Sequence, residues 1–120
     1  MNTVSKNELV FSGIKPTSRP HLGNYLGMMK QAVALQNSHD CIYSIVDLHA
    51  ITKPQKPDEL SQHTRDIVLD LLALGIDPKR SILFIQSHVP QHSQLAWIFN
   101  TITPLSWLDR LGPYKEEIAQ

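Results

Sequence analysis

Residues 8–27, ELVFSGIKPTSRPHLGNYLG, decide how the fold begins. The first six residues are a short apolar run that stops at Gly13, which is typical of a buried parallel strand. The following segment, 16–27, contains two prolines and two glycines and leads into apolar residues at helical spacing. These apolar residues are Leu22, Leu26, Met29, Ala32, Val33 and Leu35. The stretch therefore predicts a strand, an open loop and a helix that runs up to the polar segment QNSHD.

The same pattern repeats twice along the chain. Short apolar runs at 41–48 and 81–86 predict two more buried strands. Apolar stripes at 60–74 and 90–103 predict the helices that follow a strand, the first of them after the proline-rich loop TKPQKPDE. This alternation predicts an α/β fold with a parallel sheet, right-handed crossovers and helices on both faces.

Gly75 stands directly after the second predicted helix. A glycine at this place fits a left-handed helix cap, in which Ile76 folds back on Leu71. The sequence therefore predicts that this helix ends at Leu74.

The composition indicates a folded chain with one core. Its 120 residues are 42% hydrophobic and 18% charged, which excludes a disordered protein. Lys and Arg number 11, as do Asp and Glu, so any affinity for nucleic acid depends on local patches. Cys41 is the single cysteine, which excludes an internal disulfide. No apolar run reaches the roughly 18 residues of a membrane span, and the first ten residues lack an apolar signal core. We expect no membrane association and a cytoplasmic location.

Small and polar residues follow each predicted strand, where ligands bind in parallel sheets. The first such loop leads to His21, Gly23 and Asn24 at the predicted start of a helix. Free backbone N–H groups at such a helix start attract phosphate. Imidazole and carboxamide groups donate further hydrogen bonds, and a glycine lets a ligand approach the backbone. By physics alone, an ordinary turn with a solvated histidine fits these residues somewhat better than a ligand site.

Two other features of the sequence have less specific interpretations. His88 and His92 stand four residues apart, but Pro90 between them interrupts a helix and no further ligand completes a tetrahedral set, so we expect no protein-bound metal. Trp97 and Trp107 lie at apolar helical spacing, which favours a position in the core or in a subunit interface.

Four blocks, in order, resemble the class I aminoacyl-tRNA synthetases, and within them the tryptophanyl-tRNA synthetases. FSGIKPTSRPHLGNYLG at 11–27 resembles the family's first nucleotide-binding loop, where HxGH or HxGN opens the first helix. Asn24 in the last position of this motif favours the tryptophan enzymes over the tyrosine enzymes. The next three blocks resemble successive segments of the tryptophan enzymes: CIYSIVDLHAIT (41–52), GIDPKRSILFIQSHVPQH (75–92) and LDRLGPYKEE (108–117).

The resemblance implies a Rossmann-like fold of the HUP type and a tryptophan-tRNA ligase. Such an enzyme activates tryptophan with ATP and Mg²⁺, releases pyrophosphate and transfers the aminoacyl group to tRNA(Trp), usually as a homodimer. The implied catalytic residues are His21 and Asn24. The implied ATP-binding residues are Lys15, Pro16, Thr17, His21, Gly23 and Asn24, and the implied tryptophan-binding residues are Phe11, Gly13, Val46 and His49. Asp47 is expected to order its loop through backbone N–H groups.

The sequence departs from the family pattern in two ways. Lys15 stands where many tryptophan enzymes have glutamine, and Glu117 stands where many have lysine. The sequence also contains no KMSKS-like loop and no anticodon-binding domain, so residues 1–120 are interpreted as the amino-terminal half of the catalytic domain. By itself this chain is expected to bind ATP weakly and to activate tryptophan poorly. Two alternatives remain at this point: a HUP-fold nucleotidyltransferase of the pantothenate synthetase kind, and a non-catalytic nucleotide-binding module.

Overall fold

The computed structural model describes residues 8–118, and within them the side chains of all residues except Pro113 and Glu117. The chain divides into two compact units, one that ends at Val89 and one that begins at Pro90. The departure noted at Glu117 thus concerns a side chain outside the described part.

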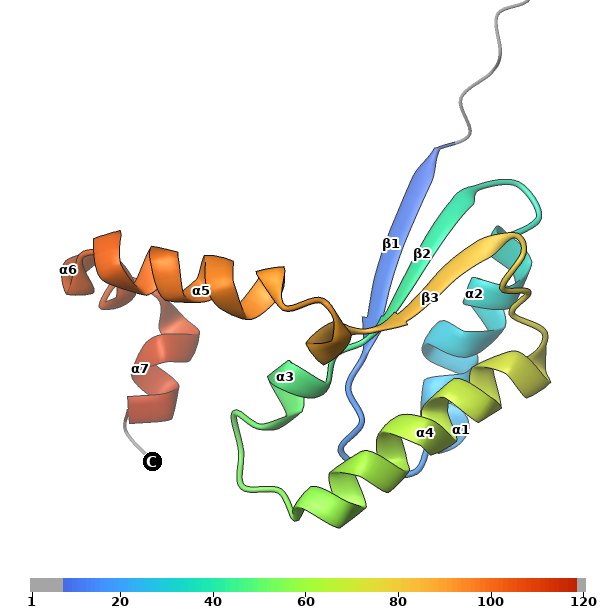
Figure 1. The fold of residues 1–120 in the computed structure, drawn as a ribbon, viewed down its shortest axis with the longest axis horizontal. Helices are drawn as coiled ribbons and strands as arrows, with labels where there is room; N and C mark the ends of the chain where they lie inside the picture. The colour runs from blue at the N-terminus through green and yellow to red at the C-terminus, as the bar shows by residue number, and fades with distance from the viewer. Residues whose placement is uncertain (1–7, 119–120) are drawn as a thin grey trace, which may run out of the picture. The chain divides into compact units, whose positions relative to one another are not determined.

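The first unit is built on three parallel strands (Figure 1). They are β1 (Leu9–Ile14), β2 (Asp40–Ile45) and β3 (Ser81–Ile85), in the order β1-β2-β3. β2 is central and pairs with both neighbours, so that Gly13 and Phe84 both lie beside Ser44. The predicted parallel sheet and its βαβαβ connection are confirmed.

β2 is shorter than the predicted strand 41–48. The chain leaves the sheet after Ile45 and forms the short helix α3 (Asp47–Ala50). Asp47 Oδ1 accepts the backbone N–H of Leu48 at 3.0 Å. Side-chain bonds of this kind favour turns and helix starts over a strand, and apolar character alone does not reveal them.

The helix after β1 is continuous but irregular. It begins as α1 (Leu22–Asn24), passes through the π-helical segment η1 (Tyr25–Met29) and continues as α2 (Lys30–Leu35). The predicted helix is confirmed, whereas the sequence analysis did not foresee the π-helical turn. Such turns are rare in proteins, and those that do occur are often found at functional sites.

The long helix α4 (Pro57–Leu74) starts three residues before the predicted stripe. Pro57 occupies its first turn, where the missing N–H costs nothing. Lys56 Nζ donates to Glu59 Oε1 at 2.8 Å, a hydrogen bond that raises the pKa of Lys56 and lowers the pKa of Glu59. The helix ends as predicted, because Gly75 adopts φ 111° and the N–H of Ile76 bonds Leu71 O at 3.0 Å.

The core lies between one face of the sheet and the helices α2 and α4, which lie on the same side of the strands in Figure 1. Its buried residues are Ile14, Met29, Ala32, Cys41, Tyr43, Ile45, Ile67, Leu71 and Ile76. Right-handed crossovers between successive neighbouring strands put their helices on one face. Both α2 and α4 therefore cover the first face, and they do not form the helix layer that was expected on the second face. Leu9, Phe11 and Ile82 lie on the second face and are exposed.

Two buried polar side chains join helices to the rest of this core. The Tyr43 hydroxyl donates to Ala32 O at 2.8 Å, and burial raises the pKa of Tyr43 well above its ordinary value. The Gln36 side chain donates to Gly75 O at 2.6 Å and accepts the N–H of Asp77 at 2.9 Å. The polar groups of both side chains form hydrogen bonds inside the protein, so their burial leaves neither side chain without a hydrogen-bond partner.

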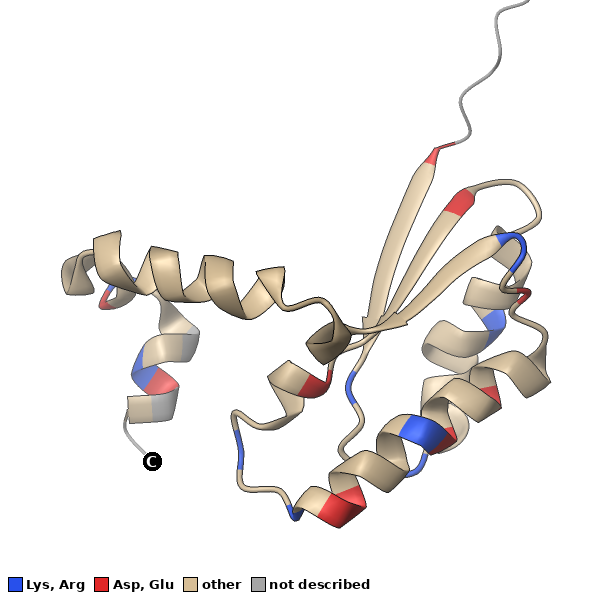
Figure 2. Ribbon diagram, in the orientation of Figure 1, with Lys and Arg blue, Asp and Glu red and all other residues tan. Residues whose placement is uncertain are grey.

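The second unit contains α5 (Gln91–Ile102), α6 (Leu105–Leu108) and α7 (Gly112–Ile118). Residues 90–108 include no Lys, Arg, Asp or Glu, so α5 and α6 carry no charged colour in Figure 2. The predicted helix at 90–103 is confirmed. Trp97 and Trp107 are 70% and 62% exposed, so the prediction of a core position is wrong for both; the interface position stays a prediction.

None of the helices between residues 8 and 118 has both the length and the apolar character that crossing a bilayer requires.

Candidate functional site

The loop after β1 ends in a reciprocal pair of hydrogen bonds between His21 and the first helical turn. His21 is the N-cap, with extended backbone (φ −110°, ψ 174°), and its Nδ1 accepts the N–H of Gly23 at 3.0 Å. In return, Asn24 Oδ1 accepts the backbone N–H of His21 at 3.0 Å. This arrangement is a capping box in which histidine takes the place of the usual serine or threonine.

The capping box decides which atoms of the two side chains can bind a ligand. His21 Nδ1 is an acceptor, so a neutral His21 ring carries its proton on Nε2. Asn24 Oδ1 is an acceptor as well, which leaves the Nδ2 amide hydrogens as donors. His21 is exposed and Asn24 is half-buried. The loop thus presents side-chain donors at a helix start, where free backbone N–H groups also favour an anion.

Gly23 is required by the ring of His21 itself. A Cβ at position 23 would lie 2.9 Å from both Cε1 and Nδ1 of His21. The sequence analysis expected this glycine to let a ligand approach the backbone. The structure adds a second reason, since a side chain here would push the imidazole out of the capping box.

The other predicted ATP-binding residues lie at the start of the same loop. Pro16 is among the most deeply buried side chains of the chain, Lys15 is half-buried and Thr17 is exposed. The loop is thus fixed by packing at Pro16 and by the capping box at His21.

The predicted tryptophan-binding residues come from the carboxyl ends of β1 and β2. Gly13 and Val46 meet, because a Cβ at Gly13 would lie 3.0 Å from Val46 Cγ1. Phe11 stands two residues before Gly13, on the same face of the sheet, and is 65% exposed. His49 lies on α3 and is exposed. The structure therefore brings Gly13 and Val46 together, with Phe11 on their face.

Asp47 orders the loops after β2 and β3, as predicted for its own loop. Its Oδ1 accepts the N–H of Leu48 at 3.0 Å and the N–H of Ser87 at 2.9 Å. The second bond joins α3 to the 3₁₀ turn η2 (Gln86–His88). The sequence analysis missed Ser87, and the only signal for it was its place directly after a strand.

An open cavity of about 500 Å³ lies beside these loops. It is lined by Asp47, Pro57, Leu60, Ser61, Thr64, Arg65, Ile85, Ser87 and His88. Within the described residues no group of three or more His, Cys, Asp or Glu is arranged to hold a metal ion.

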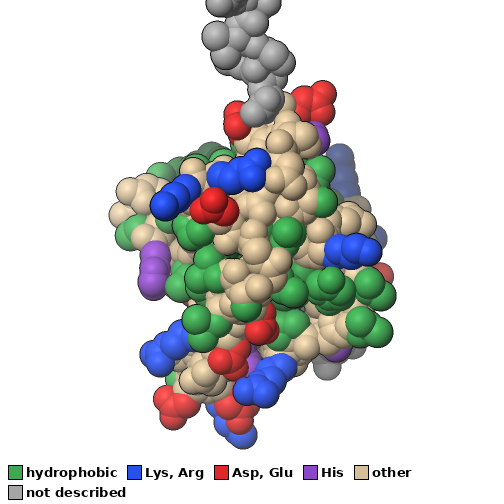
Figure 3. Space-filling model, turned by 90° about the vertical axis from the view of Figure 1, so that its right-hand side faces the viewer, with side chains coloured by type: hydrophobic (Ala, Val, Ile, Leu, Met, Phe, Trp, Pro, Cys, Tyr) green, Lys and Arg blue, Asp and Glu red, His purple; other side chains and the backbone are tan. Residues whose placement is uncertain are grey.

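Charges of both signs are mixed over the helical side of the molecule. Figure 3, which views the structure from the right-hand side of Figure 1, shows Lys and Arg side chains next to Asp and Glu side chains on that face. This mixture agrees with the balanced composition of 11 basic and 11 acidic residues. The visible face therefore has no single-sign field of the kind that attracts nucleic acid.

Comparisons with known proteins place the chain in a family. The family model described as tRNA synthetases class I (W and Y) matches residues 5–120. Tryptophan-tRNA ligase of Brucella melitensis is 50% identical over 112 residues, which are 93% of this chain and 32% of the relative. Tryptophan-tRNA ligase 2 of Streptomyces avermitilis is 54% identical over 112 residues, which are 92% of this chain and 33% of the relative.

Solved structures agree with this result. The tryptophanyl-tRNA synthetase of Campylobacter jejuni, complexed with ADP and tryptophan, matches with a TM-score of 0.82 and 35% identity over 92% of this chain and 35% of that one. A tyrosyl-tRNA synthetase of Archaeoglobus fulgidus matches with a TM-score of 0.70 and 20% identity over 89% of this chain and 35% of that one, which shows a shared fold.

The parallel sheet, its crossover helices and the capped first helix define a Rossmann-like α/β unit. The chain belongs to the family of class I tRNA synthetases for tryptophan and tyrosine. The resemblance predicted from the sequence blocks is thereby confirmed. The chain spans about a third of the length of the curated relatives that it matches.

Proposed function

We propose that this chain is the amino-terminal part of the catalytic domain of a tryptophan-tRNA ligase. In this function ATP and tryptophan react to tryptophanyl-adenylate and pyrophosphate, and the aminoacyl group passes to tRNA(Trp). The family membership and the names of the relatives support the proposal. The observation that carries it is the capping box, because it engages Nδ1 of His21 and Oδ1 of Asn24 as acceptors at a helix start and so leaves their N–H groups as the donors for a ligand.

The role of the loop is to hold the phosphates of ATP in line with the tryptophan carboxylate. One carboxylate oxygen attacks the α-phosphorus, the bond to the bridging oxygen breaks, and pyrophosphate leaves with that bond's electron pair. His21 Nε2–H and the Asn24 amide donate to phosphate oxygens whose charge grows in the transition state. Lys15, Pro16 and Thr17 line the nucleotide, and Gly23 keeps the His21 ring in place. No protein nucleophile takes part.

Mg²⁺ is proposed to enter with ATP. The loop offers hydrogen-bond donors, which suit phosphate oxygens and do not suit a cation. The residues present therefore do not fit as Mg²⁺ ligands, and the step above is written without a role for the ion.

The tryptophan side chain is proposed to lie against Phe11, Gly13, Val46 and His49. The exposed ring of Phe11 offers a flat apolar face to an indole. Gly13 contributes no side chain at the end of the strand, and Val46 takes the space that a Cβ there would occupy.

A homodimer and a cytoplasmic location complete the proposal. The uncharged segment 90–108 supports the dimer, because it exposes large apolar side chains. These side chains are Leu95, Trp97, Ile98, Phe99, Ile102, Leu105 and Trp107.

Thermal unfolding with ligands tests the proposed function. A ligand that binds only the folded chain raises its apparent stability. We expect ATP to raise the unfolding temperature, tryptophan to add to that rise, and tyrosine to add nothing. His21→Gln should abolish most of the ATP response, whereas His92→Gln, a matched change in the second unit, should keep it. An equal response to tyrosine and tryptophan would contradict the assignment of the substrate.

The rate of tryptophan-dependent pyrophosphate exchange tests the expectation for the isolated chain. We expect little or no exchange by these 120 residues, and a rate near that of a whole tryptophan-tRNA ligase would contradict this part of the proposal.

A further inference from the structure

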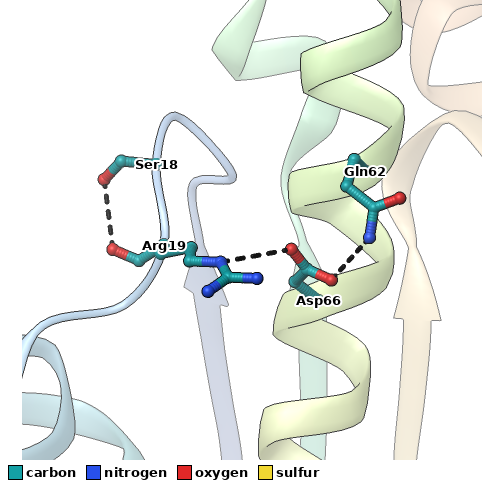
Figure 4. A network of polar contacts seen from close by, with 4 residues as sticks. All are labelled: Ser18, Arg19, Gln62 and Asp66. Carbon is teal, nitrogen blue, oxygen red and sulfur yellow. Dashed lines mark hydrogen bonds and ion pairs between the residues drawn. The ribbon is translucent and has the colours of Figure 1, made fainter.

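An ion pair connects the loop after β1 to α4 (Figure 4). Arg19 Nε lies 3.8 Å from Asp66 Oδ2, and the two residues are far apart in the sequence. Arg19 stands two residues before the N-cap His21. The proposed function gives neither Arg19 nor Asp66 a role.

The helix holds its side of this contact in place. The Asp66 side chain is only 18% exposed, and Gln62 Nε2, one turn earlier on α4, donates to Asp66 Oδ1 at 2.7 Å. The Arg19 side chain is 85% exposed. The Asp66 carboxylate is therefore the fixed partner of this pair. The Arg19 guanidinium belongs to the exposed loop, whose position the ion pair can restrict.

The middle of the loop lacks other anchors. A hollow of about 370 Å³ lies between the loop and α4, lined by Arg19, Pro20, Asp66, Leu69 and Asp70, so side-chain packing does not fill this space. Thr17, Ser18 and Arg19 are exposed. In the part of the chain that the structure describes, the Arg19 pair is the one polar contact that links residues 15–20 to α4.

We infer that Asp66 is a positioning residue for the phosphate-binding loop. Held by Gln62, it acts through Arg19 and keeps the segment before His21 at a set distance from α4. This limits the positions of the His21 ring in the absence of a nucleotide, and it therefore lowers the conformational-entropy cost of binding. The effect on ATP rests on the proposed function, whereas the effect on the loop does not.

Two readouts on the full 120-residue chain test the inference. The first is amide hydrogen exchange without ligand at His21 and Gly23, whose N–H groups bond inside the capping box, with the core amide of Ile45 as reference. The second is the affinity for ATP. Because an exposed ion pair contributes at most about fivefold to an equilibrium, we expect Arg19→Gln and Asp66→Asn each to speed exchange and weaken ATP binding by about threefold.

Matched variants separate this pair from general charge effects. Asp70→Asn removes an acidic group from the same helix and the same hollow, and it should leave both readouts unchanged. In a double-mutant cycle, adding Asp66→Asn to Arg19→Gln should cause no further loss. The swapped pair, Arg19→Asp with Asp66→Arg, should recover much of the protection, and high salt should reduce the difference between the parent chain and its variants.

Three results would overturn the inference. The first is unchanged exchange at His21 and Gly23 in both single variants. The second is additive losses in the double variant. The third is tighter ATP binding by Asp66→Asn with weaker binding by Arg19→Gln, because Arg19 would then be a phosphate ligand that Asp66 withholds. If the parent chain shows no ATP response, the proposed function fails, and the exchange readout still decides whether the pair orders the loop.

Discussion

The ring of His21 occupies the space beside Gly23, where its Nδ1 accepts the glycine N–H at 3.0 Å. The hydrogen bond can form only because residue 23 is a glycine and has no Cβ. A residue with a Cβ would displace the ring, and without the ring the N–H of residue 23 would lose its partner.

Gly23→Ala is therefore expected to damage ligand binding more than folding. The new Cβ would lie 2.9 Å from the ring, and because His21 is exposed the ring can swing away. Alanine also favours the helix by about 1 kcal/mol, which offsets part of the lost cap. We expect ATP affinity, measured by titration, to fall about tenfold, since hydrogen bonds to charged groups contribute about 1.5 to 3 kcal/mol.

Gly27→Ala is the matched control for this change. A Cβ at Gly27 meets nothing within 4 Å, and the residue lies in the same helix. It should keep the affinity for ATP and leave folding unchanged or slightly better. If both variants bind ATP like the parent chain, His21 is not held for phosphate in the way proposed.

Two variants of Asn24 separate its cap role from its proposed ligand role. Asn24→Asp keeps an oxygen for the His21 N–H but replaces the side-chain NH₂ donor with a carboxylate oxygen. It should keep stability in urea unfolding, since acidic groups suit helix starts, and lose most ATP affinity by repulsion. Asn24→Ala should lose about 1 kcal/mol of stability as well. Normal ATP binding by the aspartate variant would contradict the proposed contact.

Tyr43→Phe should destabilise the first unit and change its response to alkali. The change removes a buried hydroxyl that bonds Ala32 O, which costs about 1 to 2 kcal/mol. Burial raises the pKa of Tyr43, so the folded state favours the neutral phenol. That stability is fully present below the unfolded pKa near 10 and is lost as pH rises through the higher folded value.

Urea unfolding of both proteins below and above pH 10 measures this difference. The parent chain should lose stability more steeply above pH 10 than Tyr43→Phe. Equal slopes would mean that Tyr43 ionises alike in the folded and the unfolded chain.

Gln36→Leu should be among the costly single changes in the first unit. Gln36 is 7% exposed and bridges Gly75 O and the Asp77 N–H, both of which would lose this partner. We expect a loss of about 3 kcal/mol in chemical denaturation, since each unsatisfied buried group costs about 1 to 3 kcal/mol. Gln31→Leu, at an exposed position of α2, which ends just before Gln36, should cost far less. Similar losses in both variants would show that the bridge contributes little.

The sequence could predict the features of the fold that depend on neighbouring residues. Apolar runs and helical stripes predicted the three strands and the helices between them, and Gly75 predicted the end of α4. The early end of β2 was missed because the bond from Leu48 N–H to Asp47 competes locally with the strand. The exposure of Trp97 was missed because a stripe shows that a helix has an apolar face and does not show what covers it.

The sequence indicated candidate site residues, which stay a prediction, but it did not indicate the hydrogen bonds between them. The motif at His21 and Asn24 was visible in the sequence, but the capping box depends on the extended backbone at His21. The contacts from Asp47 to Ser87 and from Arg19 to Asp66 each join residues about 40 or more positions apart. No local pattern encodes such pairs, because the crossover connections bring them together only in the folded chain.

The π-helical turn at Tyr25–Met29 has a consequence for the length of this segment. Its hydrogen bonds span one residue more than those of an α-helix. The turn therefore accommodates one extra residue between the N-cap His21 and the core residues Met29 and Ala32. In a regular α-helix, one added residue would rotate all later side chains by about 100° around the helix axis. Here the wider π-helical turn accommodates the added residue without this rotation. The capped end at His21 and the buried face of the helix can therefore each keep their own orientation when the spacing between them changes by one residue.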